Sequence, residues 1–362
     1  MLQLSQALKL SPDRFTPLAR TPWAGLQIQR LYKSHIRPSP AAIGESWEVS
    51  CDPDFPSEVL LYHRPLLELL QEEPEQMLSA TYVAKKGATC EILIKLLNAD
   101  QPLSVQVHPR DEDPHLLAKE CGKPESWLIL HAEPGAGLYL GFSKPIARDK
   151  LRELLVRDAD LRPYLQFVPV EAGDYFEIQP GVPHAIGPGI TLLEPQRVLL
   201  GKSGKTYRFW DWGRRYDSNG AIDQERGKPR ELHIDEGLRL IDPESQVGSD
   251  FVDGLRRLPE KHLLPAGKGT IEIYPVNDSY QVVRVRLAAQ GALEWQLRDG
   301  FATMVSLHGV FTCEHRQGQL VDFGAGEPGF LPYVAFPMQM RAISSCDLVL
   351  VIPAGAQLSW TV

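Results

Sequence analysis

The 362-residue chain is predicted to be mostly β, with its strands arranged in sandwiches or barrels of the jelly-roll kind. Proline (30) and glycine (29) are plentiful and dispersed, which suits short strands joined by turns better than long helices. Segments of strand length that run apolar, or alternate between apolar and polar, recur along the chain. Helical periodicity is confined to a few places, chiefly residues 146–157 and 234–241, which we expect to decorate a β core.

The strand segments fall into two groups separated by a polar stretch after Asp242 that is rich in turn residues. A chain of this length exceeds the size at which one core usually keeps growing, so two domains are expected, at residues 1–245 and 246–362. The predicted strands are 91–97, 103–108, 127–131, 175–179, 190–194 and 207–212, then 270–274, 280–287, 301–307, 330–335 and 348–352.

Composition excludes several classes of function. The net charge of -8 argues against affinity for nucleic acid or anionic membrane, so the cations that would hold an anionic substrate must be local. The five cysteines are scattered, odd in number and without CxxC spacing, which predicts reduced thiols and no zinc–thiolate site. No apolar run approaches the length of a membrane span, so we expect a cytoplasmic protein.

Residues 103–108 alternate with period two, so side chains of opposite chemistry are expected on the two faces of a strand. One face would carry Leu103, Val105 and Val107, and the other Ser104, Gln106 and His108. From this segment alone, an edge strand with its polar face in water and a ligand-binding strand are equally good interpretations. Just upstream, Lys95 interrupts a strand that otherwise reads as buried, so its ammonium either reaches solvent or faces a polar cavity that holds an anion.

Two further segments place polar residues where a strand starts. Glu125 follows Gly122-Lys123-Pro124 and opens the strand that contains Trp127 on the same face. His184 comes after a strand and a Pro-Gly turn, and such a turn aims the following side chain rigidly, as a metal ligand requires.

At these residues the sequence resembles the class I mannose-6-phosphate isomerases, whose fold is a pair of cupin barrels. The spacing is similar to that of the two cupin metal motifs, and the likeness covers most of residues 20–240. It is carried by residues 43–50 (IGESWEVS), Lys95, 101–109 (QPLSVQVHP), 122–125 (GKPE), 180–185 (PGVPHA), Glu194, Gln196, 206–208 (TYR), 211–214 (DWGR) and 230–234 (RELHI).

The resemblance implies that Gln106, His108, Glu125 and His184 bind one metal ion, zinc in this family, within the first of two cupin barrels. Imidazole and carboxylate suit zinc, manganese or iron, and four protein ligands leave catalysis in need of a fifth position for water or sugar. The smaller second barrel contains His308 and His315 but neither metal motif, so we expect it to be free of metal.

An aldose–ketose isomerase moves a proton between C1 and C2 through an enediol-type intermediate, and needs an electrophile, a proton shuttle and a grip on the phosphate. By the resemblance, Arg208 is the catalytic arginine and Lys123 is the lysine beside the metal-binding glutamate. Lys95 and Ser104 would hold the phosphate or orient the sugar, and Glu194 is the candidate for the proton shuttle. Without the resemblance, we would favour an ion pair of Arg208 with Asp211 or Asp217.

The sequence departs from the family pattern at two places. Longer members have a histidine where this chain has Gly122, so a ring-opening role for that histidine does not transfer. The stretch between Gln196 and Arg208 is longer than usual and includes Lys202, Gly204 and Lys205. Its two interpretations are an extra phosphate-binding loop and, favoured here, a solvated surface loop.

Two other functions remain open from the sequence. Two histidines and a carboxylate would also suit an iron-dependent cupin oxygenase. A non-catalytic cupin that binds a sugar phosphate would carry the same residues without turnover. The glutamine together with Lys95 and Arg208 favours an anionic sugar as the partner, and a monomer is the working expectation for the assembly.

Overall fold

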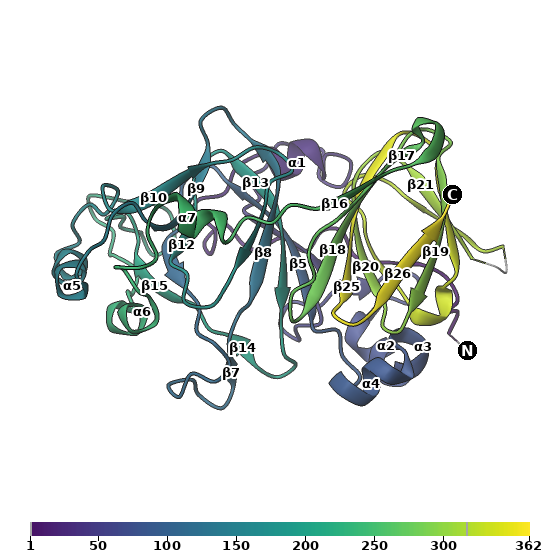
Figure 1. Ribbon diagram of the computed structural model, residues 1–362, viewed down its shortest axis with the longest axis horizontal. Coiled ribbons are helices and arrows are strands. Elements are labelled where there is room, and N and C mark those ends of the chain that lie inside the picture. Colours follow the sequence, from purple (N-terminus) through teal and green to yellow (C-terminus); the bar gives the residue numbers. More distant parts are fainter. Residues whose placement is uncertain (1, 316–317) are drawn as a thin grey trace.

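The computed structural model describes residues 2–315 and 318–362, and it is mostly β, as predicted (Figure 1). Its larger sheets, named I to IV from left to right in Figure 1, are antiparallel throughout. Sheet I contains β10 (Leu165–Pro169), β9 (Gly137–Phe142), β12 (His184–Ile186), β6 (Val105–Val107) and β15 (Tyr207–Trp210). Sheet II contains β11 (Tyr175–Ile178), β8 (Glu125–Ala132), β13 (Ile190–Arg197), β5 (Ile92–Ala99) and β2 (Glu45–Val49).

The C-terminal part of the chain supplies most of the other two sheets. Sheet III contains β1 (Leu8–Lys9), β23 (Pro328–Leu331), β20 (Ala302–His308), β25 (Cys346–Pro353), β18 (Tyr280–Leu287), β17 (Gly269–Ile273) and β16 (Glu260–Leu263). Sheet IV contains β22 (Leu320–Phe323), β21 (Phe311–His315), β24 (Met338–Ala342), β19 (Ala292–Arg298) and β26 (Gln357–Thr361). Two short pairs complete the strands: β3 (Glu58–Val59) with β4 (Arg64–Pro65), and β7 (Glu120–Cys121) with β14 (Ser203–Gly204).

The side chains of sheet II alternate between two apolar layers, which explains why its strands read as continuous apolar runs. On β5, Leu97 and Ala99 pack against sheet I, whereas Ile94 and Leu96 belong to a cluster shared with sheet III. Sheets III and IV enclose a third apolar cluster, to which Val283, Met304 and Trp295 contribute. The sheets therefore form four layers, with sheets II and III in the middle.

Helices cover the ends and outer faces of these layers. The two expected helices are confirmed as α5 (Arg148–Val156) and α6 (Ile234–Leu240), which pack on the outer face of sheet I through residues such as Leu151 and Leu238. Helices that sequence reasoning did not predict are α1 (Gln27–Leu31), α2 (Leu66–Glu72), α3 (Pro74–Leu78), α4 (Ala80–Lys86) and α7 (Gly248–Asp253). Helix α7 lies in the polar stretch expected to be a linker.

Every segment predicted as a strand overlaps an observed strand, with shifted ends. The largest difference is at residues 330–335, where β23 ends at Leu331 and Tyr333–Ala335 form a 3-10 turn. All five cysteines are free and buried, as expected for reduced thiols. In the part of the chain that the structure describes, no helix is both long and apolar enough to cross a membrane.

Candidate metal centre

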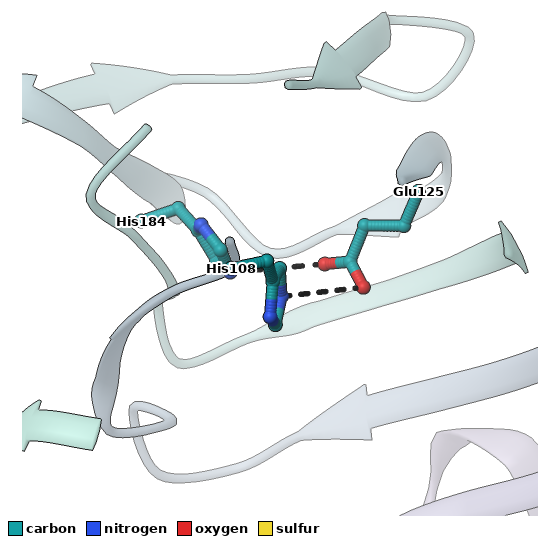
Figure 2. Close-up of side chains that lie close together, drawn as sticks. All are labelled: His108, Glu125 and His184. Carbon is teal, nitrogen blue, oxygen red and sulfur yellow. Dashed lines mark ion pairs between the residues drawn. The ribbon is translucent and has the colours of Figure 1, made fainter. Parts of the chain in front are cut away.

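Three side chains that are distant in sequence meet between sheets I and II (Figure 2). His108 follows β6, Glu125 begins β8 and His184 begins β12, and one ligand atom of each lies within 4.8 Å of the others. Nε2 of His108 is 3.5 Å from Oε2 of Glu125, and Nε2 of His184 is 3.7 Å from Oε1. All three side chains are buried, so the group is shielded from bulk water.

Both imidazoles are held with the same nitrogen facing the centre of the group. Nδ1 of His108 lies 3.0 Å from the carbonyl oxygen of Lys205, and Nδ1 of His184 lies 2.8 Å from that of Val182. Because a carbonyl can only accept, each Nδ1 carries the proton, and the lone pair of each Nε2 points inward. Burial lowers the pKa of both rings, that of His184 to about 3, so both are neutral near pH 7.

These donors fit a divalent metal ion. Nε2 of His108 is buried and has no hydrogen-bond partner among the described residues, a costly arrangement that a bound cation would remove. Two neutral imidazoles and a carboxylate suit zinc, manganese or iron. The predicted ligand Gln106 lies opposite His184 where β6 pairs with β12, and it lines a cavity beside the three side chains. Its Nε2 donates to Oγ of Ser104 at 2.9 Å.

The position of β6 within sheet I decides between the two interpretations of residues 103–108, an edge strand in water and a ligand-binding strand. β6 lies between β12 and β15, so it is a central strand, and the interpretation as a solvated edge strand is wrong. Val105 and Val107 are fully buried beneath α5 and α6, whereas Ser104 and Gln106 line the cavity. Leu103 differs from the prediction, because it precedes β6 and packs against the opposite apolar cluster.

The cavity beside the candidate metal ligands has a volume of about 290 Å³ and is predominantly polar. This volume is near the lower end of the range of about 300–1,000 Å³ that is typical of small-molecule sites. All of the predicted catalytic and substrate-binding residues line it. Its polar walls include Arg20, Glu45, Lys95, Ser104, Gln106, Lys123, Glu125, His184, Glu194, Thr206, Arg208 and Arg230.

On strand β13, Glu194 lines this cavity, and Gln196 lies two residues further on the same face of the strand. Glu194 lies opposite Lys95 of β5, and Gln196 lies opposite Glu125 of β8. Nε2 of Gln196 donates to Oε2 of Glu125 at 3.1 Å and to Oε1 of Glu194. Nε1 of Trp127 donates to the other oxygen of Glu194 at 3.0 Å, so this carboxyl group is held on both sides.

The electrostatics of the cavity separate its two central carboxyl groups. Burial, with the charge of Glu125, raises the pKa of Glu194 to about 7, although Lys123 and Lys95 act in the opposite direction. Glu125 is also buried, but the charge of Lys123 holds its pKa well below the usual range. Glu125 is thus a fixed carboxylate, while Glu194 can gain and lose a proton near pH 7.

The sequence left open whether Lys95 reaches solvent or faces a cavity, and the structure shows where Lys95 and Lys123 lie. Nζ of Lys95 lies 3.8 Å from Oε1 of Glu194 and 4.6 Å from the centre of the Trp47 ring, so it faces the cavity and does not reach solvent. Nζ of Lys123 lies 2.7 Å from Oε2 of Glu125. Burial alone would lower the pKa of Lys123, but the neighbouring carboxylates of Glu125 and Glu194 raise it. Lys123 therefore stays charged.

Arg208 is free of carboxylate partners within ion-pair distance among the described residues. Its Nε donates to Oγ of Ser104 at 3.2 Å, and its Nη1 donates to the carbonyl of Glu231 at 3.3 Å. The alternative of an ion pair with Asp211 or Asp217 is wrong, because Asp211 is taken by two other arginines, Arg214 and Arg230. The charge of Arg208 is therefore available to a ligand.

Gly122 has a steric reason to lack a side chain. A Cβ at this position would lie 2.8 Å from the carbonyl oxygen of Pro109 and 3.1 Å from the backbone nitrogen of Asp111. Backbone atoms cannot move aside cheaply, so a histidine at this position is excluded by the local fold.

Sequence reasoning gave no role to three groups that hold the site: the amide of Gln196, the indole of Trp127 and the carbonyl of Lys205. The period of β13 could have placed Gln196 on the face of Glu194. The carbonyl of Lys205 carries no signal in the sequence, because every residue has one.

Comparisons with known proteins show which family this chain is similar to. The family model for the catalytic domain of type I phosphomannose isomerase matches residues 22–133. Mannose-6-phosphate isomerase of Streptococcus mutans is 32% identical over 222 residues, which cover 60% of this chain and 64% of that protein, just under two thirds of its length. Mannose-6-phosphate isomerase ManA of Bacillus subtilis is 30% identical over 270 residues, 72% of this chain and 75% of that protein.

Solved structures of similar proteins share the fold. The mannose 6-phosphate isomerase from Bacillus subtilis superposes with a TM-score of 0.74 at 22% identity, covering 96% of this chain and 99% of that chain. A mannose 6-phosphate isomerase bound with zinc and yttrium gives a TM-score of 0.69 at 16% identity, with coverage of 96% and 99%.

Proposed function

Because this chain belongs to the type I mannose-6-phosphate isomerase family, we propose that it interconverts mannose 6-phosphate and fructose 6-phosphate at a metal centre between sheets I and II. The observation that carries the proposal is that the candidate metal ligands and three cationic side chains occur together. Inward-facing, neutral histidines and a fixed carboxylate lie beside a cavity that is lined by Lys95, Lys123 and Arg208. In a chain of net charge -8, these are the local cations that an anionic sugar requires.

We propose one zinc ion per chain, with Gln106, His108, Glu125 and His184 as its ligands. The zinc-containing structure of a similar isomerase supports this choice of metal. When bound, the ion would supply Lewis acidity toward the hydroxyl and carbonyl oxygens of the sugar.

The proton transfer is assigned to Glu194. Isomerisation needs a base that takes a proton from one carbon and returns it to the neighbouring carbon, and a pKa near the working pH suits both steps. The pKa of Glu194 is about 7, and its carboxyl group is held by Trp127 and Gln196. The base form is the ionised carboxylate, so the reaction should become faster as the pH rises through this value.

The remaining residues bind and stabilise charge. Arg208 is a permanent cation with no carboxylate partner among the described residues, so it can stabilise the negative charge that develops on a sugar oxygen. Lys123 adds positive charge beside Glu125. We assign Lys95 and Ser104, which line the cavity, to holding the phosphate or orienting the sugar.

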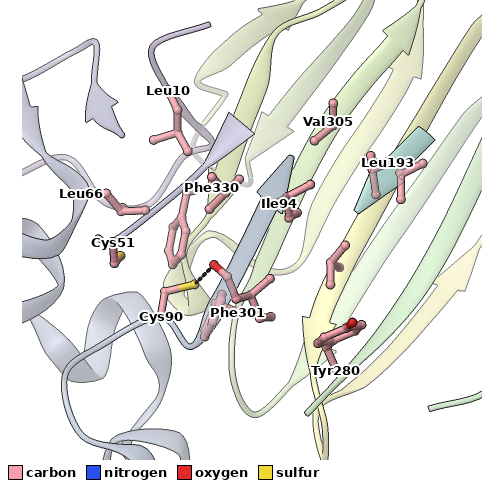
Figure 3. Packing of buried hydrophobic residues seen from close by; sticks show 14 of the residues in the cluster. Leu10, Cys51, Leu66, Cys90, Ile94, Leu193, Tyr280, Phe301, Val305 and Phe330 are labelled. Atoms are coloured by element: carbon pink, nitrogen blue, oxygen red, sulfur yellow. Dashed lines mark hydrogen bonds between the residues drawn. The ribbon is translucent and has the colours of Figure 1, made fainter. Parts of the chain in front are cut away.

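We also propose that each pair of sheets forms a cupin barrel, and that the chain divides at residue 245 into a catalytic barrel and a smaller, metal-free barrel. The metal-site residues all lie in the first part. The two parts share an apolar cluster in which Ile94 and Leu193 meet Tyr280 and Val305 (Figure 3).

A coupled assay of fructose 6-phosphate formation from mannose 6-phosphate, with metal analysis of the same sample, tests the function. We expect turnover that a chelator abolishes and zinc restores. Oxygen uptake by an iron-loaded protein would support the oxygenase instead, and tight sugar-phosphate binding without turnover would support a non-catalytic cupin.

A further inference from the structure

The long segment between Gln196 and Thr206, here named the strap (residues 197–205), is exposed at residues 200–203, as expected for a solvated surface loop, but its backbone is held in place. Backbone nitrogens of Ser203 and Lys205 donate to the carbonyls of Lys119 and Cys121, both at 2.8 Å, and form the parallel pair β7–β14. Nζ of Lys205 also lies 2.6 Å from Oε1 of Glu120. Residues 203–205 of the strap are therefore tied to the residues that precede Lys123.

One end of the strap contacts a candidate metal ligand directly. The carbonyl of Lys205 is the acceptor, at 3.0 Å, for Nδ1 of His108. A metal-binding histidine is oriented by the hydrogen bond of its other ring nitrogen, and mutation of such a partner typically lowers metal affinity by about 10–100-fold. The position of the Lys205 carbonyl, which the β7–β14 pair fixes, thus sets the orientation of the His108 ring.

Gly204, next to Lys205 at the same end of the strap, packs against Lys123. A Cβ at Gly204 would lie 3.2 Å from Cγ and 3.3 Å from Cβ of Lys123. This is a tighter contact than side chains usually make, so a larger residue at Gly204 would displace the stem of Lys123. Lys123 is in turn 2.7 Å from Oε2 of Glu125, and a displacement would reach the candidate metal ligand.

The other end of the strap is clamped by an ion pair. Nη1 and Nη2 of Arg197 bind the two carboxylate oxygens of Asp111, each at 2.6 Å, in the two-pronged geometry that makes such pairs strong. Nη2 also donates to the carbonyl of Gly122 at 3.2 Å. This clamp fixes the chain immediately before Lys123 and Glu125.

We propose that the strap is a positioning element of the metal centre, which orients His108 through the Lys205 carbonyl and holds Lys123 and Glu125 through Gly204 and Arg197. This inference rests on the proposed metal-dependent function. The strap touches no reacting atom in this account, and it acts by keeping two ligands in the geometry that binds the ion.

Arg197→Met and Gly204→Val test the proposal, with Lys202→Met as the control because Lys202 is exposed on the same strap. Zinc affinity of the metal-free proteins is measured by competition with a chromogenic chelator. Ring-nitrogen NMR of labelled histidine reports whether Nδ1 of His108 keeps its proton. We expect the two strap variants to bind zinc about 10–100-fold more weakly, with a disturbed His108 signal, and the control to match the wild type.

Unchanged zinc affinity and an unchanged His108 signal in folded Arg197→Met and Gly204→Val would overturn the proposal. If near-ultraviolet circular dichroism shows that Arg197→Met does not fold, Gly204→Val and Lys205→Met decide by the same criterion. A wild type that binds zinc without isomerising mannose 6-phosphate would contradict the proposed function alone. A wild type that isomerises, with variants equal to it in affinity, would contradict the strap alone.

Discussion

The space between sheets I and II and the space between sheets III and IV are both enclosed by two antiparallel sheets, but they contain different side chains. Between sheets III and IV, the packed side chains are apolar, as shown by Val283, Met304 and Leu348. Between sheets I and II, the apolar cluster gives way to a row of polar side chains that are all less than 10% exposed: Lys95, Ser104, His108, Glu125, His184, Glu194 and Gln196.

The difference teaches where function resides in this fold. Burying charged groups costs several kcal/mol unless they are paired, so an interior that keeps them sacrifices stability. Sheets III and IV bury apolar side chains and gain stability, while sheets I and II keep ionisable groups with shifted pKa values, which is typical of a functional site. Changes between sheets I and II should therefore alter chemistry, and changes between sheets III and IV should alter only stability.

The largest expected effect comes from His184→Ala. Removing a ligand should lower zinc affinity and kcat/KM together by more than about 100-fold, since even groups that merely support a ligand are worth about 10–100-fold. His308→Ala, at an exposed position on β20 in the second part, is the matched control and should leave both unchanged. Chelator competition and the coupled assay measure the two quantities, and full activity in a metal-free His184→Ala protein would refute the site.

Glu194→Gln should retain zinc and lose turnover by about 10²–10⁴-fold, the usual contribution of a general base. In the wild type, kcat/KM should rise with pH through about 7, because the ionised form of Glu194 is the base. In the Glu194→Gln variant, this rise of kcat/KM with pH should be absent. An identical profile in the variant would remove Glu194 from the mechanism.

Arg208→Ala should keep zinc affinity and lower kcat by about 10²–10³-fold, the effect of removing one group that stabilises a developing oxyanion. The guanidinium contacts Ser104 and a backbone carbonyl but none of His108, Glu125 or His184 in the described hydrogen bonds. Metal analysis beside steady-state kinetics checks this separation. Loss of zinc from the variant would show that Arg208 supports the metal centre instead.

Gln196→Met should have a smaller effect, about 10-fold on kcat/KM, the lower end of the usual range for a group that supports a ligand. Its amide donates to the carboxylates of both Glu125 and Glu194, so the variant loses a donor that favours the ionised form of Glu194. The pKa of Glu194 should rise, and the acid limb of kcat/KM should move to higher pH. A limb that stays in place would mean that the amide does not influence the base.

Leu348→Ala should have the smallest effect on chemistry. Leu348 is fully buried between sheets III and IV, so truncation should lower the free energy of unfolding by about 2–5 kcal/mol. Zinc affinity and kcat per folded molecule should be unchanged. Denaturant unfolding and metal titration of the same preparation compare the two, and weakened zinc binding would show that the interiors are coupled.

Much of the fold could be predicted because strand period and turn residues are local signals. The period-two pattern of residues 103–108 correctly placed Val105 and Val107 away from Gln106 and His108. Helices α2 to α4 were missed because each is only five to seven residues long and they are separated by Glu73 and Ser79, so none displays a long helical period.

The candidate site was accessible from the sequence only as a set of residue types. Family resemblance joined His108, Glu125 and His184, and the structure brings the three together. The contacts of Gln196 with Glu125 and of Lys205 with His108 depend on strand register and on backbone carbonyls, neither of which the sequence specifies locally. The pKa of Glu194 likewise depends on burial that only the packed layers create.

Anomalous diffraction at the zinc edge, on crystals of the zinc-loaded protein, tests the central claim most directly. We expect one peak between sheets I and II, at about 2.0–2.2 Å from Nε2 of His108, Nε2 of His184 and a carboxylate oxygen of Glu125. A peak elsewhere, or none at this position in crystals of active enzyme, would contradict the account.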